Sequence, residues 1–297
     1  MNSLDKIQKA GKQLSDSLAS LVKIALMSRR PSPRCSDSKD TIIIMGNGPS
    51  LRDAMQNDMD VLMKYPRLAV NLSALAPEFT SLRPQYYILA DIAFFLKDKT
   101  GKVPALWEAL AAVDWEMTLF LPVTARKMPE VSKLPANVTV KYYNLTPAEG
   151  WRWLMHPIYD SGLAMPRPRN VLIPSIMAAM REGFSRIVLI GADHNWSKTL
   201  WVTDRNCVVS VQPHFYKDDD EELRRAEEIF RNVRLHEVYE NYAIAFRSYH
   251  NLKAYTDARG VEVLNATPGS FLDACNRTPL ASLPEFPIQN STFKIKN

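Results

Sequence analysis

The chain has 297 residues, of which 46% are hydrophobic and 23% are charged. That length suits one large domain, or one domain with a lid, better than two unrelated domains. The hydrophobic content is enough for a large core, which needs no disulfide or structural metal to stabilise it. Residues 1–39 carry a net charge of +5, as does the whole chain, so the remaining residues are neutral overall. A nucleic-acid-binding protein would carry its basic residues on the folded domain, so the sequence predicts no nucleic-acid partner.

The cysteines and the N-terminal residues give indications of the cellular compartment in which the protein works. Cys35, Cys207 and Cys275 are far apart and form no CxxC or Cys/His pattern, which argues against structural zinc and fits a reducing environment. Lysines interrupt the apolar residues near the N-terminus, so no signal peptide is predicted. No run reaches the roughly 20 apolar residues of a membrane span. We expect a cytoplasmic protein, with the inner face of the cytoplasmic membrane as an alternative location.

Residues 3–26 are predicted to form an amphipathic helix, with lysines on much of its polar side. One face collects apolar residues at i, i+3, i+4 spacing: Leu4, Ile7, Leu14, Leu18, Leu21, Val22 and Ala25. Residues 1–30 then either contact a membrane surface peripherally, or pack on the body or on a second subunit of a homo-oligomer. Pro31 and Pro33 end the helix, so residues 1–39 read as a basic helix and linker.

Residues 40–277 are predicted to form an α/β nucleotide-binding catalytic domain. Short apolar runs alternate with helical patterns, which indicates a doubly wound, mostly parallel sheet. The predicted strands are 41–45, 68–71, 86–90, 117–121, 138–142, 186–191 and 261–264. The predicted helices follow Leu51 and cover 104–112, 175–183 and two segments within 220–258. An inserted hairpin, Thr199–Val202 with Cys207–Val211, belongs to a lid at about 195–222, and the prolines of 278–297 indicate a C-terminal tail.

Ligands of open α/β sheets bind beyond the carboxyl ends of the strands, where the strand order reverses. The first predicted strand ends in Gly46-Asn47-Gly48-Pro49-Ser50. Its glycines allow positive φ and close approach of a ligand, and the next helix offers free N–H groups to a phosphate. The loop matches neither GxGxxG nor a P-loop, and the alternative is a tight strand-to-helix turn.

Polar residues follow three further strand or helix boundaries. Asn71 follows the second predicted strand and binds the nucleotide or caps the turn. Asp91 follows the third and holds a ribose hydroxyl or caps the next helix. Asn170 precedes a helix that starts at Pro174 or Ser175, whose free N–H groups are expected to face a ligand.

The segment Gly191-Ala192-Asp193-His194-Asn195-Trp196 follows the strand at 186–191. Gly191 opens the strand end, and Asp193 and His194 place an acid beside a titratable base. In Gln212-Pro213-His214-Phe215-Tyr216, His214 is the candidate general base, and Trp196 and Tyr216 are candidate lid or acceptor contacts.

Other candidates are weaker. Asp218–Glu222 contains an Asp-x-Asp pattern but reads better as the acidic start of a helix, so no metal site is predicted. His156, in Trp151–His156, is assigned to a loop that faces the substrate. The sequence contains no Gly-x-Ser-x-Gly elbow.

The chain resembles a known family in patches over roughly residues 41–275. Ile42–Leu51 resembles the opening motif of the bacterial lipooligosaccharide sialyltransferases of glycosyltransferase family 42. Gly183-Phe184 with Ile187–Asp193 resembles the family's second motif, and Val263–Ser270 its late strand and Pro-x-Ser turn. Asn71 stands where the family places a nucleotide-contacting asparagine.

This resemblance implies a Rossmann-like domain with a lid, a CMP-activated sugar donor, a glycan or glycolipid acceptor, and inverting transfer without metal or other cofactor. Gly46, Asn47, Gly48 and Asn71 would contact the nucleotide, and Asn170 and Ser175 would approach the phosphate. The chain departs from the family at Asp91, where the family carries asparagine. It also has Tyr242 or Ala243 in place of the catalytic histidine, so His214 takes the role of base.

A wider group shares the Gly-x-Gly-Pro-Ser opening and a late Gly-x-Asp. It contains hydroxymethylpterin pyrophosphokinases and proteins linked to flagellin glycosylation. The chain resembles polysaccharide-locus proteins that carry Gly-Ala-Asp-His and His-Phe-Tyr more closely than it resembles either group. These resemblances imply a glycosyltransferase of bacterial surface polysaccharide or lipooligosaccharide biosynthesis. The alternatives are a Mg-dependent diphosphokinase, with Asp91 and Asp193 as ligands, and a non-catalytic nucleotide-sugar-binding partner.

Overall fold

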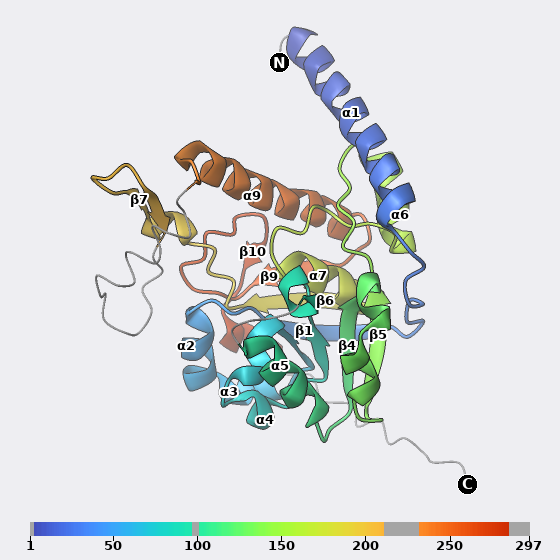
Figure 1. Cartoon of the computed structure of the whole chain (residues 1–297), viewed down its shortest axis with the longest axis vertical. Helices are drawn as coiled ribbons and strands as arrows, with labels where there is room; N and C mark the ends of the chain where they lie inside the picture. Colours follow the sequence, from blue (N-terminus) through green and yellow to red (C-terminus); the bar gives the residue numbers. More distant parts are fainter. Residues whose placement is uncertain (1–2, 97–100, 211–231, 285–297) are drawn as a thin grey trace.

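A computed structural model describes residues 3–96, 101–210 and 232–284 (Figure 1). His214, Tyr216 and the acidic run Asp218–Glu222 lie outside these ranges, as do the second half of the predicted lid and most of the C-terminal tail.

Eight strands form one parallel sheet in the order β10-β9-β6-β1-β2-β3-β4-β5. The strands are β1 (Lys39–Met45), β2 (Arg67–Val70), β3 (Tyr86–Ile88), β4 (Met117–Pro122), β5 (Val138–Tyr143), β6 (Phe184–Ile190), β9 (Glu262–Asn265) and β10 (Asn276–Arg277). The chain builds outward from β1 to β5 and then returns to place β6 on the other side of β1. The strand order therefore reverses between β1 and β6.

Helices cover both faces of the sheet (Figure 1). They are α1 (Ser3–Met27), α2 (Ser50–Asn57), α3 (Met59–Met63), α4 (Phe79–Leu82), α5 (Lys102–Ala111), α6 (Arg152–Ser161), α7 (Leu172–Arg181) and α9 (Leu235–Asp257). Ile42 and Ile44 of β1 belong to the core shared with α6, α7 and α9, and Ile43 and Met45 to the core under α2–α5. A strand that is buried on both faces has a continuously apolar sequence, and this pattern predicted β1.

The predicted doubly wound α/β fold is confirmed, and so is the hairpin, an antiparallel pair of β7 (Leu200–Val202) and β8 (Val208–Ser210). The loop expected at Trp151–His156 is wrong, because Arg152 begins helix α6. Met155 and Tyr159, four residues apart, bury one face of this helix, and Gly162 ends it in the left-handed region. The His156 ring packs edge-on against Tyr255.

Helix α1 attaches to the body through small polar side chains. Ser20 Oγ donates to the Glu149 carbonyl (2.8 Å) and accepts from the Glu149 N–H (2.9 Å). Ser17 Oγ accepts from the Trp151 N–H, and a Cβ at Gly150 would overlap Ser17. Only the C-terminal half of the helix lies against the body, and its N-terminal end projects away (Figure 1). No helix in the described part of the chain is both long and apolar enough to cross a membrane.

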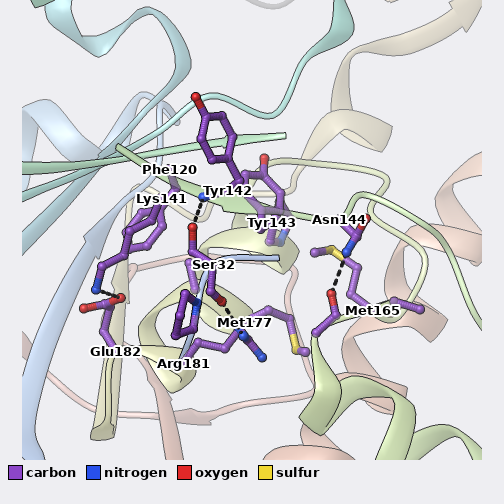
Figure 2. A pocket seen from close by; sticks show the side chains of 15 residues that line it. Ser32, Phe120, Lys141, Tyr142, Tyr143, Asn144, Met165, Met177, Arg181 and Glu182 are labelled. Atoms are coloured by element: carbon purple, nitrogen blue, oxygen red, sulfur yellow. Dashed lines mark hydrogen bonds and ion pairs between the residues drawn. The ribbon is translucent and has the colours of Figure 1, made fainter. Parts of the chain in front are cut away.

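The segment after α1 is fastened to the body beside β5 (Figure 2). Ser32 bonds Tyr142 twice, through backbone N–H to carbonyl (2.8 Å) and through Oγ from the Tyr142 N–H (2.8 Å), and its carbonyl accepts from Arg181 (2.8 Å). The two amide atoms of Asn144 bond the backbone of Arg29. The cavity enclosed here has a volume of about 30 Å³, so it holds water and not a nucleotide. The linker therefore fixes α1 instead of leaving it on a flexible tether.

A buried carboxylate stabilises this region. Glu182, at the end of α7, has a side chain only 4% exposed and pairs with Lys141 of β5 (2.6 Å) and Lys39 of β1 (3.4 Å). We expect Glu182→Gln to lower the free energy of unfolding by about 2 kcal/mol. The substitution removes the negative charge that pairs with Lys39 and Lys141 at a site shielded from solvent. Urea denaturation measures the change. In the control, Asp114→Asn removes the exposed pair with Arg83 and should cost less than about 1 kcal/mol. Equal losses in the two variants would contradict the prediction.

Candidate functional site

The loop after β1 lies directly against the end of β6. The Gly46 N–H donates to the Ile190 carbonyl (2.8 Å), and the Gly48 N–H to the Gly191 carbonyl (3.0 Å). A Cβ at Gly46 would lie 2.5 Å from the Gly191 oxygen, and one at Gly48 would overlap Asp193 Oδ2. Neither Gly46 nor Gly48 has a positive φ, so the expectation that these glycines serve a left-handed turn is wrong. Their missing side chains instead let two backbone segments meet.

Asp193 has a structural partner in this contact. Its carboxylate accepts from Ser50 Oγ (2.7 Å) at the start of α2, and its side chain is buried. Pro49 precedes the helix as its N-cap residue. Gly191, with φ +63°, provides the turn that brings Asp193 under the loop. These residues join the two strand ends where the strand order reverses.

Asn47 and Asn71 organise the neighbouring strand end. The Asn47 amide donates to the Val70 carbonyl (3.3 Å) and accepts from Ser73 Oγ (2.8 Å). Asn71 has φ +52°, and its Oδ1 accepts from the Ala90 N–H (3.2 Å). Both asparagines therefore set the path of the chain after β2, and Asn71 also lines the cleft described next.

A cleft of about 600 Å³ opens beyond the carboxyl ends of β2, β3 and β5. It brings together Asn71, Asp91 and Asn170, three of the predicted site residues. Its lining residues are Lys23, Asn71, Ala90, Asp91, Ile92, Leu145, Pro147, Arg167, Pro168, Arg169, Asn170 and Val171. One Asp91 oxygen accepts from the Ala93 N–H (2.9 Å), the capping contact that the sequence left open. Three basic side chains and one carboxylate make this wall suited to an anion.

Sequence reasoning missed the basic residues of the cleft. Arg167 stands between Pro166 and Pro168, and Arg169 and Asn170 follow Pro168. This pattern, arginines in a stiff turn before a helix, is a signal that could have identified them. Arg167 pairs with Glu149 (3.1 Å), and its exposed neighbour Arg169 lies next to Asn170 in sequence.

Two buried donors in this wall have no hydrogen-bond acceptor among the described residues: Arg167 Nε and Asn170 Nδ2. The orientation of the Asn170 amide is fixed, because its Oδ1 accepts from the Leu172 N–H (3.0 Å) and from Tyr249 Oη (2.8 Å). Buried donors are rarely left unpaired, because each costs about 1–3 kcal/mol. Both residues line the cleft, so a ligand bound there is a candidate source of the missing acceptors.

His194 stands behind this wall. Its Nε2 lies 2.6 Å from Tyr249 Oη. Because Tyr249 gives its one proton to Asn170, His194 must donate through Nε2–H. Burial lowers the pKa of His194 to about 4 and raises the pKa of Tyr249 well above its ordinary value, so both groups are neutral near pH 7. A series of two hydrogen bonds therefore runs from His194 through Tyr249 to Asn170.

Aromatic packing holds His194 in an unusual backbone conformation. His194 has φ +51°, and its ring stacks on Trp196 at 4.6 Å between centroids. Trp196 also packs against Tyr242 and Phe246 of α9, beside the β7–β8 hairpin. Trp196 thus lies in a packed cluster, and its proposed contact with an acceptor stays a prediction.

Ser175 does not begin a helix. Helix α7 begins at Leu172, so the N–H of Ser175 already donates to the Val171 carbonyl (3.1 Å), as does its Oγ (2.7 Å). Its side chain is fully buried. The expectation that N–H groups from Ser175 onward face a ligand is therefore wrong, and Asn170 occupies the helix entry instead. Within the described ranges, no group of three or more His, Cys, Asp or Glu residues is placed to hold a metal ion.

The fold and the cleft define an α/β protein with a basic site at the carboxyl edge of a doubly wound sheet. Neither a family model nor a curated protein matches the sequence. A solved structure of MAf glycosyltransferase from Magnetospirillum magneticum AMB-1 is similar over 94% of this chain, at 14% identity and a TM-score of 0.48. The chain spans 40% of that protein's length. A similarity at this level assigns neither a family nor an activity to this chain.

The close contact between the two strand ends predicts a penalty for any side chain at Gly48. We expect Gly48→Ala to lower the free energy of unfolding by about 1–3 kcal/mol, because the methyl group would meet Asp193 and the Gly191 carbonyl. Gly11→Ala is the control, since nothing lies within 4 Å of its Cβ position and it lies in a helix. Urea titration of both variants measures the difference, and a Gly48→Ala protein as stable as the wild type would show that the loop does not need this contact.

The low pKa of His194 predicts pH-dependent stability. The folded protein binds this proton near pH 4 and the unfolded chain near pH 6.5, so stability is full above pH 6.5 and falls as the pH drops toward 4. The loss reaches about 3 kcal/mol, and His194→Gln should remove most of it. Thermal unfolding at pH 5 and pH 7.5 tests this. His236→Gln, at an exposed site, should keep the wild-type dependence; an unchanged slope in His194→Gln would refute the assignment.

Proposed function

We propose that the chain is a glycosyltransferase that takes a sugar from a CMP-activated donor, in the biosynthesis of bacterial surface polysaccharide or lipooligosaccharide. The observation that carries the proposal is a pair of donors without an acceptor in the described ranges, Arg167 Nε and Asn170 Nδ2, on two residues that line a basic cleft beyond the sheet. A sugar nucleotide offers phosphate oxygens to these donors and hydroxyl groups to Asp91 and Asn71. The resemblance of the 46–51 loop to the sialyltransferase motif supports cytidine as the base.

The donor phosphate sits against Arg167, Arg169 and Asn170 in this proposal, with Lys23 adding charge. The nucleoside lies toward Asn71 and Asp91. The 46–50 loop supports this end of the cleft, because Asn47 bonds Val70, the residue before Asn71. In this arrangement Gly46, Gly48, Pro49, Ser50, Gly191 and Asp193 hold the loop in place.

The transfer step needs a base and a stabilised leaving group. His214 removes the proton of an acceptor hydroxyl as that oxygen bonds the anomeric carbon. The bond from this carbon to the phosphate oxygen breaks, and CMP leaves with the electron pair. The arginines and the Asn170 amide stabilise the growing charge on the phosphate, which makes the reaction independent of a metal ion. His194 acts as a positioning residue that orients Asn170 through Tyr249.

Calorimetric titration with CMP in EDTA tests the donor site. Arg167→Gln and Asn170→Ala should each weaken CMP binding at least about tenfold, because a charged or buried hydrogen bond to phosphate is lost. Lys133→Gln, an exposed change of the same charge outside the cleft, should bind CMP like the wild type. A thermal-unfolding check confirms that each variant is folded.

Three outcomes would redirect the assignment. Binding of ATP only with magnesium would favour the diphosphokinase. CMP binding without transfer of any sugar to any acceptor would favour a non-catalytic nucleotide-sugar-binding partner. CMP binding that is unchanged in both cleft variants would show that the nucleotide does not occupy this cleft.

A further inference from the structure

Helix α1 leaves its apolar face uncovered. Eight large apolar side chains on this helix are 40–69% exposed: Leu4, Ile7, Leu14, Leu18, Leu21, Val22, Leu26 and Met27. The residues buried against the body are instead Ser17 and Ser20, with Ile24 partly buried on the core. A folded monomer rarely exposes so continuous an apolar stripe unless the stripe has a partner.

The attachment of α1 fixes the direction of this stripe. At 100° per residue, six of the eight exposed residues, from Leu4 to Val22, lie within one side of the helix. Ser17 and Ser20 lie on a different side and bond the backbone of Glu149 and Trp151. Because the linker after the helix is also bonded to β5, the stripe cannot turn inward onto the body without breaking these contacts.

Charge indicates what covers the stripe. The helix carries Lys6, Lys9, Lys12 and Lys23 against Asp5 and Asp16, and three arginines follow before residue 35. At 100° per residue the lysines lie outside the stripe, on the other sides of the helix, so their net positive charge is held over an anionic headgroup layer when the stripe lies in lipid.

A second copy of the helix fits the stripe less well. Gly11 lies in the middle of the stripe and would leave a gap in a seam between two helices, whereas fluid lipid chains fill it. The residues that flank the stripe, among them Gln8, Ala10 and Ser15, include no acidic side chain that could pair with the lysines of a partner helix.

We propose that α1 is a docking helix that lies in the interface of an anionic membrane, with its apolar stripe in the lipid. Lys23, on the side of the same helix away from the stripe, lines the cleft, so docking holds the cleft close to the membrane surface. Trp153 of α6, 71% exposed next to the attachment point of α1, adds an aromatic side chain suited to that layer. Resting on the proposed function, this places a lipid-linked glycan as the acceptor.

Vesicle flotation of the full chain, without nucleotide, tests the docking. Phosphatidylcholine vesicles with about 30% phosphatidylglycerol should bind the protein, and pure phosphatidylcholine vesicles should bind at least about tenfold less. Leu14→Gln combined with Leu18→Gln should reduce binding to the anionic vesicles at least about tenfold. The control, Met63→Gln combined with Leu75→Gln, removes two exposed apolar side chains from α3 and the turn after β2 and should bind like the wild type.

The molar mass in solution, measured by light scattering, separates the two partners. A wild-type dimer that the Leu14/Leu18 double variant converts to a monomer, with no binding to vesicles, overturns the proposal in favour of a second copy. Equal binding to both kinds of vesicle, or to neither, also overturns it. CMP titration without vesicles is independent: if vesicles bind but CMP does not, the docking helix stands and the lipid-linked acceptor falls.

Discussion

The site depends on the backbone contact between Gly46–Gly48 and the end of β6. These two segments follow the neighbouring strands β1 and β6, between which the strand order reverses, and no Cβ fits between them. From one side of the contact, Asn47 reaches β2 and sets the turn that carries Asn71. From the other, the chain continues to His194, whose left-handed backbone turns its ring toward Tyr249. Both walls of the cleft are therefore positioned from one junction, and a shift there would move both.

The donors of the cleft that have no acceptor among the described residues lower the stability of the fold but leave groups free to bind a ligand. Asn170 uses its oxygen to accept from the Leu172 N–H at the start of α7 and from Tyr249, which fixes the amide and leaves Nδ2 without an acceptor among the described residues. A tyrosine or aspartate nearby could satisfy this donor and would stabilise the fold by removing the cost of an unmade hydrogen bond. A donor whose amide is held by two hydrogen bonds, from Leu172 and Tyr249, is preorganised for a ligand, because little ordering is needed on binding.

The strands and the strand-end residues could be predicted from sequence, since parallel strands buried on both faces read as apolar runs and the ligand edge follows from their direction. That rule selected Asn71 and Asp91, the predicted helix start selected Asn170, and the structure brings all three to one cleft. It assigned Gly46 and Gly48 to the nucleotide but could not predict their contact with the end of β6, because residues that follow a strand do not reveal which segment lies opposite them. Arg167 was missed because it stands between two prolines in a loop that follows no strand of the sheet. His194 was predicted as a titratable group at the sheet edge, but Trp196 and two aromatic residues of α9, Phe246 and Tyr249, bury it.

The apolar spacing of α1 was equally visible in sequence, yet the spacing alone did not tell which side of the helix faces the protein. Amphipathic helices usually bury the apolar side, because each large side chain removed from water contributes about 1.5–3 kcal/mol. Here the buried side is built from serines that bond backbone groups, and Gly150 allows the close approach. These serine hydrogen bonds fix the orientation of the helix but bury little apolar surface. The apolar stripe therefore stays exposed and can contact another surface. Since Lys23 of the same helix lines the cleft, one helix carries both the uncovered stripe and part of the cleft wall.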